Sequence, residues 1–365
     1  MKLFQRLLVA PAALGLLAPI SANANEVNLN EISNYSNVES IDLVNSFNND
    51  GLKESPLLAG GEGLVDTPAD SFSSTTSASF GSTFYVGTID EGADGGVTTF
   101  TYDFGMGLST SFTGEDSLDV AILGGNANTT AVDTVMGGDG SGDVLTLDGI
   151  SYTFPLGGFT VITGDGVGVD DLNTGACAYS AFTDTLSDCG TPSIGGDADS
   201  AVAVGYDFGN GFTAAGGVGF GSETDGILTD EDSSTIGLEL AYTADAYGLS
   251  LSYTDDDEQG GDDSYYSIQG AFTPDAPYSV SVGYEFDDGD DDSYFIGLTS
   301  EVGPGALSVG LGTQGLADDH DDNLMYELAY SYAINDGMTV TPGMFIVEDA
   351  TDDEFGMVVK TSFSF

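Results

Sequence analysis

Positive charge is almost absent from this sequence. Its 365 residues include 60 acidic residues, only 4 basic ones and a single histidine, for a formal net charge of −56. Such a chain repels nucleic acid and anionic lipid surfaces and attracts cations, so no nucleic-acid partner is expected. Tryptophan is also missing, yet 17 Tyr and 21 Phe residues separate the chain from disordered acidic tails.

Long hydrophobic runs are missing as well. The apolar run at residues 7–17 is shorter than the 18 or so residues that a membrane-spanning helix needs. It follows Lys2 and Arg6 and precedes an A-x-A cleavage pattern at residues 22–24, which predicts a secretory signal over residues 1–24. The residue directly after this cleavage position is not a cysteine, so no lipoprotein anchor is expected. A membrane role would therefore have to use a β-barrel.

Cysteine and histidine are too scarce for several kinds of site. Cys177 and Cys189 are the only cysteines, and together with His320 they cannot supply a four-ligand zinc site. In an exported chain, two cysteines this close together are expected to form a disulfide, worth about 3 kcal/mol through chain entropy.

The mature chain divides into two parts. Residues 25–74 are rich in Asn and Ser and end in a Gly/Pro/Asp linker, which indicates a periplasmic leader. From residue 75 to residue 365 the hydrophobic pattern repeats every two residues. In "STIGLELAYT", for example, Ile236, Leu238 and Leu240 alternate with Gly237 and Glu239. Such segments are roughly ten residues long, as tilted membrane strands are.

Aromatic residues and connection lengths favour a membrane barrel over a large soluble β protein, whose strands also alternate. Tyr or Phe lies near both ends of many apolar faces, as Tyr278 and Phe286 do, and this is typical of aromatic girdles. From residue 199 onward, short turns alternate with long acidic loops. Outer-membrane barrels have short periplasmic turns and longer outer loops.

The pattern predicts an all-β, transmembrane, antiparallel up-and-down barrel of about sixteen strands, wide enough for an aqueous lumen. A phase change near Asp148 and Gly149 predicts a β-bulge. The expected strands are 75–87, 97–112, 117–125, 144–154, 158–164, 199–208, 211–221, 233–243, 246–255, 263–273, 276–286, 292–301, 305–313, 322–333, 337–347 and 354–365.

Several segments resemble a known family. The start of the chain, "MKLFQRLLVAPAALGLLAPISANANEVNLNEISNYS", resembles that of cyanobacterial outer-membrane porins, which are relatives of the carbohydrate-selective OprB-type porins. "SFSSTT" (71–76), "TSFTGEDSL" (110–118) and "LDGISYTFPLGGFTVITG" (147–164) resemble the opening of that family's barrel. The S-layer-homology domain that the family usually carries between leader and barrel is absent here, so wall anchoring through that domain is not expected.

The resemblance implies a homotrimer in the lipid of the cell outer membrane, inserted by the barrel-assembly machinery. In this family the terminal aromatic pattern, here Phe363 and Phe365, serves as the assembly signal. A long loop in porins folds inward and narrows the pore, and residues 165–197 form the longest loop here. A Cys177–Cys189 bridge would stiffen that loop.

Two sets of site residues follow for a pore that passes small solutes by diffusion. The expected constriction carries Asp165, Asp170, Asp171 and Asp184. The expected lumen wall carries Asp103, Asp207, Glu239, Glu285, Glu327 and Lys360. Rings of charged side chains set the ion preference of a pore, and basic residues are almost missing from these strands, so we expect cation preference. Relatives with basic residues along their strands prefer anions or phosphate, and that preference is not expected here. Sugar, metal ion and general solute uptake all remain open.

Other functions remain as alternatives. The acidic loops could bind Ca²⁺ or Mg²⁺ weakly, but they lack EF-hand spacing, so neither a built metal site nor a cofactor is expected. A secreted or surface-exposed Ca²⁺-binding or adhesive β protein without a pore is the main alternative. A barrel enzyme would need a nucleophile beside a base. His320 in "DDHDD" is expected to be a solvated loop residue, so no enzyme is predicted.

Overall fold

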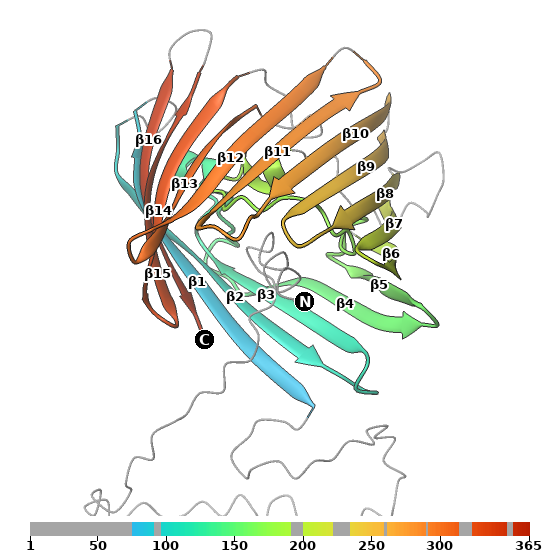
Figure 1. The fold of residues 1–365 in the computed structure, drawn as a ribbon. Coiled ribbons are helices and arrows are strands. Elements are labelled where there is room, and N and C mark those ends of the chain that lie inside the picture. The colour runs from blue at the N-terminus through green and yellow to red at the C-terminus, as the bar shows by residue number, and fades with distance from the viewer. Residues whose placement is uncertain are drawn as a thin grey trace, which may run out of the picture.

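The computed structural model describes residues 75–90, 96–190, 200–221, 234–258, 261–289, 291–313, 323–348 and 353–365. Within these ranges, sixteen strands close into one barrel in which every strand pairs with its neighbours in the chain and β1 pairs with β16 (Figure 1). All pairings are antiparallel. The predicted sixteen-stranded up-and-down barrel is therefore confirmed.

The strands run from seven to fourteen residues. Their bounds are β1 Thr76–Ile89, β2 Thr99–Thr110, β3 Ser117–Gly125, β4 Thr146–Leu156, β5 Phe159–Asp165, β6 Ser200–Gly209, β7 Phe212–Phe220, β8 Ser234–Thr243, β9 Tyr247–Glu258, β10 Gly261–Phe272, β11 Tyr278–Asp287, β12 Asp292–Val302, β13 Gly305–Gly312, β14 Met325–Asn335, β15 Met338–Val347 and β16 Glu354–Ser364.

The two faces of the wall differ sharply in polarity. On β8, Leu238 is 53% exposed, whereas its neighbour Glu239 is 5% exposed. The same alternation recurs around the ring, because successive side chains of a strand point to opposite faces. The outer surface is therefore apolar, and the polar and small side chains point into the barrel.

Aromatic rings gather near both ends of the outer apolar face. Near the short connections, Phe212 of β7 packs on Tyr242 of β8 with ring centroids 4.6 Å apart. At the opposite ends of the strands, Tyr266 of β10 stacks on Phe286 of β11 with centroids 5.2 Å apart. The outer surface thus has an apolar band bordered by aromatic belts, as membrane barrels have.

The connections differ in length from one end of the barrel to the other. Strands β6 and β7 are joined by Asn210 and Gly211, whose φ angles of 55° and 87° allow a tight reversal. At the other end, residues 126–145 join β3 to β4 and residues 166–199 join β5 to β6. Because the strand number is even, the start of β1 and the end of β16 lie together at the end with the tight turns.

The predicted bulge is present on β4. Gly149 pairs with Ala121 and Leu147 pairs with the next residue, Ile122, so Asp148 has no partner on β3. The bulge reconciles the two apolar phases of this strand.

No helix within the described part of the chain is long and apolar enough to cross a membrane.

Candidate functional site

Two connections fold into the barrel and occupy part of its interior. We call residues 166–190 the strap, which is the described part of the connection between β5 and β6. We call residues 126–145 the helical loop, which contains helix α3 (Ala131–Val135). Figure 1 shows both segments, in green, inside the ring of strands. The strap follows the inner wall from β6, where Leu172 lies over Gly205, to β15, where Phe182 lies over Gly343.

The first half of the strap is bound to the wall through its backbone. The Glu239 carboxylate on β8 accepts hydrogen bonds from the backbone N–H of Thr174, at 2.5 Å, and of Gly175, at 3.0 Å. Two strands further on, the Gln269 side-chain oxygen accepts the Ala176 N–H at 3.1 Å. The wall therefore holds the main chain of the strap at three successive residues.

The second half of the strap converges on one carboxylate, that of Glu327 on β14. Its Oε1 accepts hydrogen bonds from the Tyr179 hydroxyl and the Phe182 N–H, both at 2.8 Å. Its Oε2 accepts the Thr183 N–H at 2.9 Å and the Thr183 hydroxyl at 2.5 Å. Glu327 is only 3% exposed, so the strap covers it.

Glycine residues on the inner face let the strap lie close to the wall. A Cβ atom added to Gly217 would lie 2.7 Å from the Cα of Val169, and one added to Gly343 would lie 2.5 Å from the Phe182 ring. Real Cβ atoms do not approach other atoms this closely, so any side chain at these positions would displace the strap. Further glycines of this kind are Gly237 beside Val169 and Gly297 and Gly310 beside Tyr179.

A small apolar core forms between the strap and the wall. The predicted disulfide joins Cys177 to Cys189, with Cα atoms 5.8 Å apart. It closes the second half of the strap, whose Leu186 and Cys189 are fully buried. These side chains belong to one cluster with Phe182 and with wall residues that include Phe295 of β12 and Phe345 of β15. This packing fills the part of the lumen in front of β12–β15.

The helical loop lies against the adjoining part of the wall, at β1 and β2. Thr130 and Asp133 form a capping box at the start of α3. Asp133 also accepts a hydrogen bond from the Thr101 hydroxyl on β2, which fixes the helix to the wall. The two inward segments meet where the Asp184 N–H donates to the Val135 carbonyl at 2.9 Å. The strap and the helical loop thus support each other inside the barrel.

Charged groups gather where the two segments meet. Lys360 of β16 interacts electrostatically with Glu327, Asp103 and Asp184, and its ammonium lies 6.0 Å from the centre of the Phe182 ring. On β2, Asp103 accepts hydrogen bonds from the Thr83 N–H at 2.8 Å and the Tyr85 hydroxyl at 2.7 Å. Asp103, Asp139 of the helical loop and Asp184 of the strap therefore lie near one another, with Lys360 as the one base. We call these three carboxyl residues the acidic border.

The loop carboxyl groups at this border hold their protons more tightly than usual. Burial raises the pKa of Asp139 in the helical loop, and the nearby carboxylates, first that of Asp103, raise it further. Burial also raises the pKa of Asp184, against the opposing effect of Lys360. Both side chains keep accessible surface, so their desolvation is only partial.

The four residues expected at the constriction do not lie together. Asp184 lies at the acidic border. Asp170 and Asp171 lie at the start of the strap near β6, where burial raises the pKa of Asp171. Asp165 ends β5 directly before the strap, but it is on the same phase as outward-facing Ile150, its partner on β4, so its side chain faces away from the lumen. Only one of the four is therefore beside Lys360.

The residues expected on the lumen wall have different surroundings. Glu239 and Glu327 bind the strap, as described above. Glu285 of β11 is fully buried and accepts a hydrogen bond from Ser293 at 3.2 Å. Asp207 lies at the end of β6, exposed, and accepts the Gly209 N–H across the tight turn at 2.7 Å. Of the residues expected on the lumen wall, Asp103 thus belongs to the acidic border and Lys360 lies beside it.

Two features of the barrel interior were not expected from the sequence. Asp139 stands in a glycine-rich stretch with no alternating pattern, so nothing marked it as facing the lumen. The role of Gln269 as an anchor also left no local signal. His320 lies outside the described residues. Within the described ranges, no group of three or more His, Cys, Asp and Glu side chains is placed to hold a metal ion.

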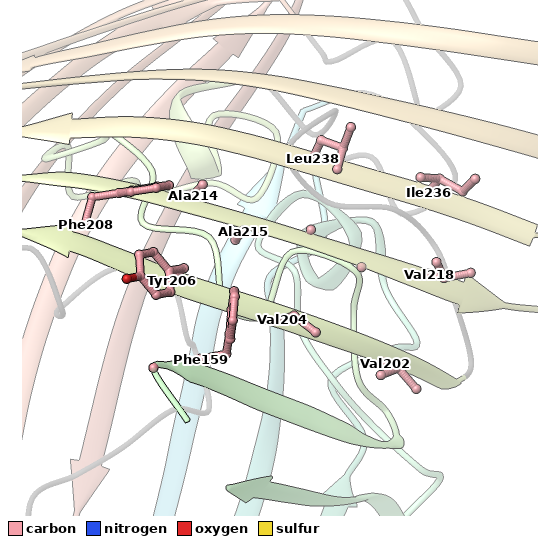
Figure 2. A pocket seen from close by; sticks show the side chains of 13 residues that line it. Phe159, Val202, Val204, Tyr206, Phe208, Ala214, Ala215, Val218, Ile236 and Leu238 are labelled. Carbon is pink, nitrogen blue, oxygen red and sulfur yellow. The ribbon is translucent and has the colours of Figure 1, made fainter. Parts of the chain in front are cut away.

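A hollow lies on the outer face of the wall and not inside the barrel. It measures about 1070 Å³ and runs along β6, β7 and β8 (Figure 2). Its floor is formed by the small residues Ala214 and Gly216, and Val204, Tyr206 and Leu238 stand along its sides. Because these side chains belong to the outward apolar phase, this groove is no part of a path through the barrel.

Comparison with known proteins identifies the architecture. No family model and no curated protein sequence matches this chain. Among solved structures, Pseudomonas putida OprB matches with a TM-score of 0.62 at 13% identity, over 80% of this chain and 94% of that one. Two engineered variants of Rhodopseudomonas blastica porin match with TM-scores of 0.57 and 0.55 at 13% and 14% identity, over 80% of this chain and all of theirs. The chain therefore has a porin-type barrel fold.

Proposed function

We propose that this protein is an outer-membrane channel that lets small solutes and ions diffuse passively and prefers cations. The observation that carries the proposal is the closed sixteen-stranded barrel with an apolar outside and a strap bound to its inner wall. Structural similarity to OprB and to Rhodopseudomonas blastica porin supports it. Such a channel works without a catalytic residue.

The outer surface supports a membrane location. Its apolar side chains would contact lipid, and the aromatic belts at both strand ends would lie at the two membrane–water interfaces. The strands satisfy one another's backbone groups around a closed ring, which is what a lipid environment requires of a β structure. The tight-turn end, where β1 begins and β16 ends, would face the periplasm.

The interior supports a narrowed water-filled passage. A barrel of sixteen strands is too wide to be filled by its own side chains. Here the strap and its apolar core take up the space in front of β12–β15. Solutes would therefore pass beside the acidic border of Asp103, Asp139 and Asp184, with Lys360 on the same side.

The charge balance supports cation preference. Charged side chains around a pore set its ion preference, and carboxylates outnumber bases both at the acidic border and in the whole chain. Lys360 is the one basic residue within the described ranges. Salt should weaken the preference, because the Debye length falls from about 10 Å at 0.1 M to about 3 Å at 1 M ionic strength.

Planar-bilayer recording tests the proposal directly. The purified full chain should give stepwise conductance, and a KCl gradient should give a reversal potential of the sign expected for K⁺ selectivity. A reversal potential that shows anion selectivity would overturn the charge argument. Absence of any conductance from protein that migrates as a folded barrel would overturn the channel itself.

Further parts of the proposal concern partners and solutes. We propose insertion by the barrel-assembly machinery, a homotrimeric assembly, and weak Ca²⁺ or Mg²⁺ binding by the acidic loops. Sugars are candidate solutes, and comparing sugar and ion fluxes in liposomes would test them. Fractionation with the outer membrane and a heat-dependent gel shift are expected. Release by a chelator alone would instead favour a surface-attached Ca²⁺-binding or adhesive protein.

A further inference from the structure

We propose that Glu327 is a positioning residue that sets the aperture of the pore by holding the strap, and that it is not an ion-selecting charge. The inference rests on the proposed channel function and assigns Glu327 a role within it. It departs from the expectation, drawn from strand phase alone, that every inward carboxylate acts on the passing ions.

The hydrogen bonds of Glu327 carry the inference. Both carboxylate oxygens are engaged, and all four donors belong to Tyr179, Phe182 and Thr183 of the strap. With 3% of its surface exposed, Glu327 lies behind the strap. Its oxygens are thus not available to replace water around a cation in the lumen.

The chemistry of the donors requires a carboxylate here. An ionised carboxylate only accepts hydrogen bonds, whereas a glutamine of the same shape carries one NH₂ group. That NH₂ would face either the donors on Oε1 or those on Oε2, and the one backbone N–H on that side would lose its acceptor. A buried donor without a partner costs the full penalty of its desolvation. The strap would then move away from the wall.

The other anchors follow the same logic. A carboxylate stands where several strap donors converge, as Glu239 does for Thr174 and Gly175. Where one strap N–H reaches a wall side chain, an uncharged acceptor is enough. Gln269 serves Ala176 in this way. At these three anchors, the number of strap donors accounts for whether the wall residue is charged.

The position of Glu327 along the strap explains why it would control the aperture. Phe182 and Thr183 directly precede Asp184, whose N–H reaches the helical loop. Release of these two residues from the wall would shift Asp184 and loosen the junction of the two inward segments. The acidic border would move with them, and the passage beside it would change in width.

The test is Glu327→Gln in the full chain, reconstituted in liposomes and bilayers, with Asp119→Asn as the matched control. Asp119 is an inward carboxylate on β3 that accepts a hydrogen bond from Ser117 of the same strand. Both variants remove one negative charge from the inner wall. Uncharged sugars and polyethylene glycols of graded size measure the size cut-off. Because the strap would move away from the wall into the lumen, Glu327→Gln should shift the cut-off to smaller solutes and increase current noise, while Asp119→Asn keeps the cut-off of the wild type.

The outcomes are separable. A Glu327→Gln channel with an unchanged cut-off and a reduced cation preference would overturn the inference, because Glu327 would then act as a selecting charge. If Glu327→Gln does not assemble, the double variant Tyr179→Phe, Thr183→Ala removes two strap donors and keeps the carboxylate. An unchanged cut-off in that variant would also overturn the inference. A wild-type protein that does not conduct would instead contradict the proposed channel function.

Discussion

The ring of Phe365, the last residue, stacks on the ring of Phe80 with centroids 5.5 Å apart and planes 14° from parallel. The same two residues exchange backbone hydrogen bonds of 2.8 Å and 3.0 Å. Phe363 makes an edge-on contact with Phe84, the centroids 5.8 Å apart. The final aromatic residues therefore belong to the seam where β16 closes the barrel on β1.

Deletion of Phe365 should impair assembly and leave ion preference unchanged in the molecules that do fold. The deletion removes the last backbone pair of the seam and an aromatic stack worth about 0.5–1.5 kcal/mol beyond area burial. The fraction of protein that shows a heat-dependent gel shift measures assembly. Phe208→Ala is the control, because Phe208 is an exposed aromatic residue of the outer face away from the seam. Equal losses in both variants would contradict a special role for the seam.

A methyl group at Gly343 should narrow the pore. The added Cβ would collide with the Phe182 ring, and the strap would have to shift toward the lumen. Single-channel conductance of Gly343→Ala should fall below that of the wild type. Gly81→Ala is the matched control, because Gly81 also faces inward but only the Phe363 carbonyl, at 3.9 Å, lies near its added Cβ. Conductance that falls equally in both variants would argue against contact with the strap.

Substitution of Lys360 should change ion preference in graded steps. Lys360 opposes the carboxylates of Asp103 and Asp184, so its loss should raise cation preference, and a negative charge in its place should raise it further. Reversal potentials in a KCl gradient should rank wild type, Lys360→Gln and Lys360→Glu in order of increasing cation selectivity. Equal reversal potentials in the three channels would show that Lys360 lies outside the ion path.

Acidification should weaken cation preference at a pH above the ordinary aspartate range, whose centre is about 3.9. The raised pKa values of Asp139 and Asp184 mean that these carboxyls become neutral earlier as the pH falls. The folded chain then binds these protons more tightly than the unfolded chain. These groups therefore add stability as the pH falls, and that contribution is lost as the pH rises through their folded pKa.

Reversal potentials measured between pH 7 and pH 3 would follow this titration. Asp184→Asn should remove part of the change in reversal potential that occurs above about pH 4. It should leave the steeper change near pH 4, where ordinary carboxyls become protonated. A preference that stays constant down to that point would contradict the proposed place of these residues beside the ion path.

Strand-scale features could be predicted from the sequence because they have local causes. The period of two fixes which side chains share a face, so the number of strands, the inward phase of Glu239 and Glu327 and the bulge at Asp148 followed from neighbouring residues alone. Proximity in the chain likewise indicated the Cys177–Cys189 disulfide. Asp165 was placed with the strap because a loop boundary is hard to locate within a residue or two.

The site itself depends on contacts that no local pattern encodes. Phe182 and Glu327 meet across 145 positions of the chain, and the donors from Phe182 are backbone groups that every residue except proline carries. The glycines beside Tyr179 and Phe182 were visible in the sequence only as members of the small-residue face. The folded chain was therefore needed to separate an anchor such as Glu327 from a border residue such as Asp103.

Parts of the strap are held through main-chain N–H groups, and its path there does not depend on side chains that stay exposed. Ser180 shows this, since its N–H donates to Thr299 while its side chain stays exposed. Exchange of such an exposed residue would alter the lining of the channel and leave the scaffold intact. A barrel of this design can acquire a different solute preference through single substitutions without having to fold anew.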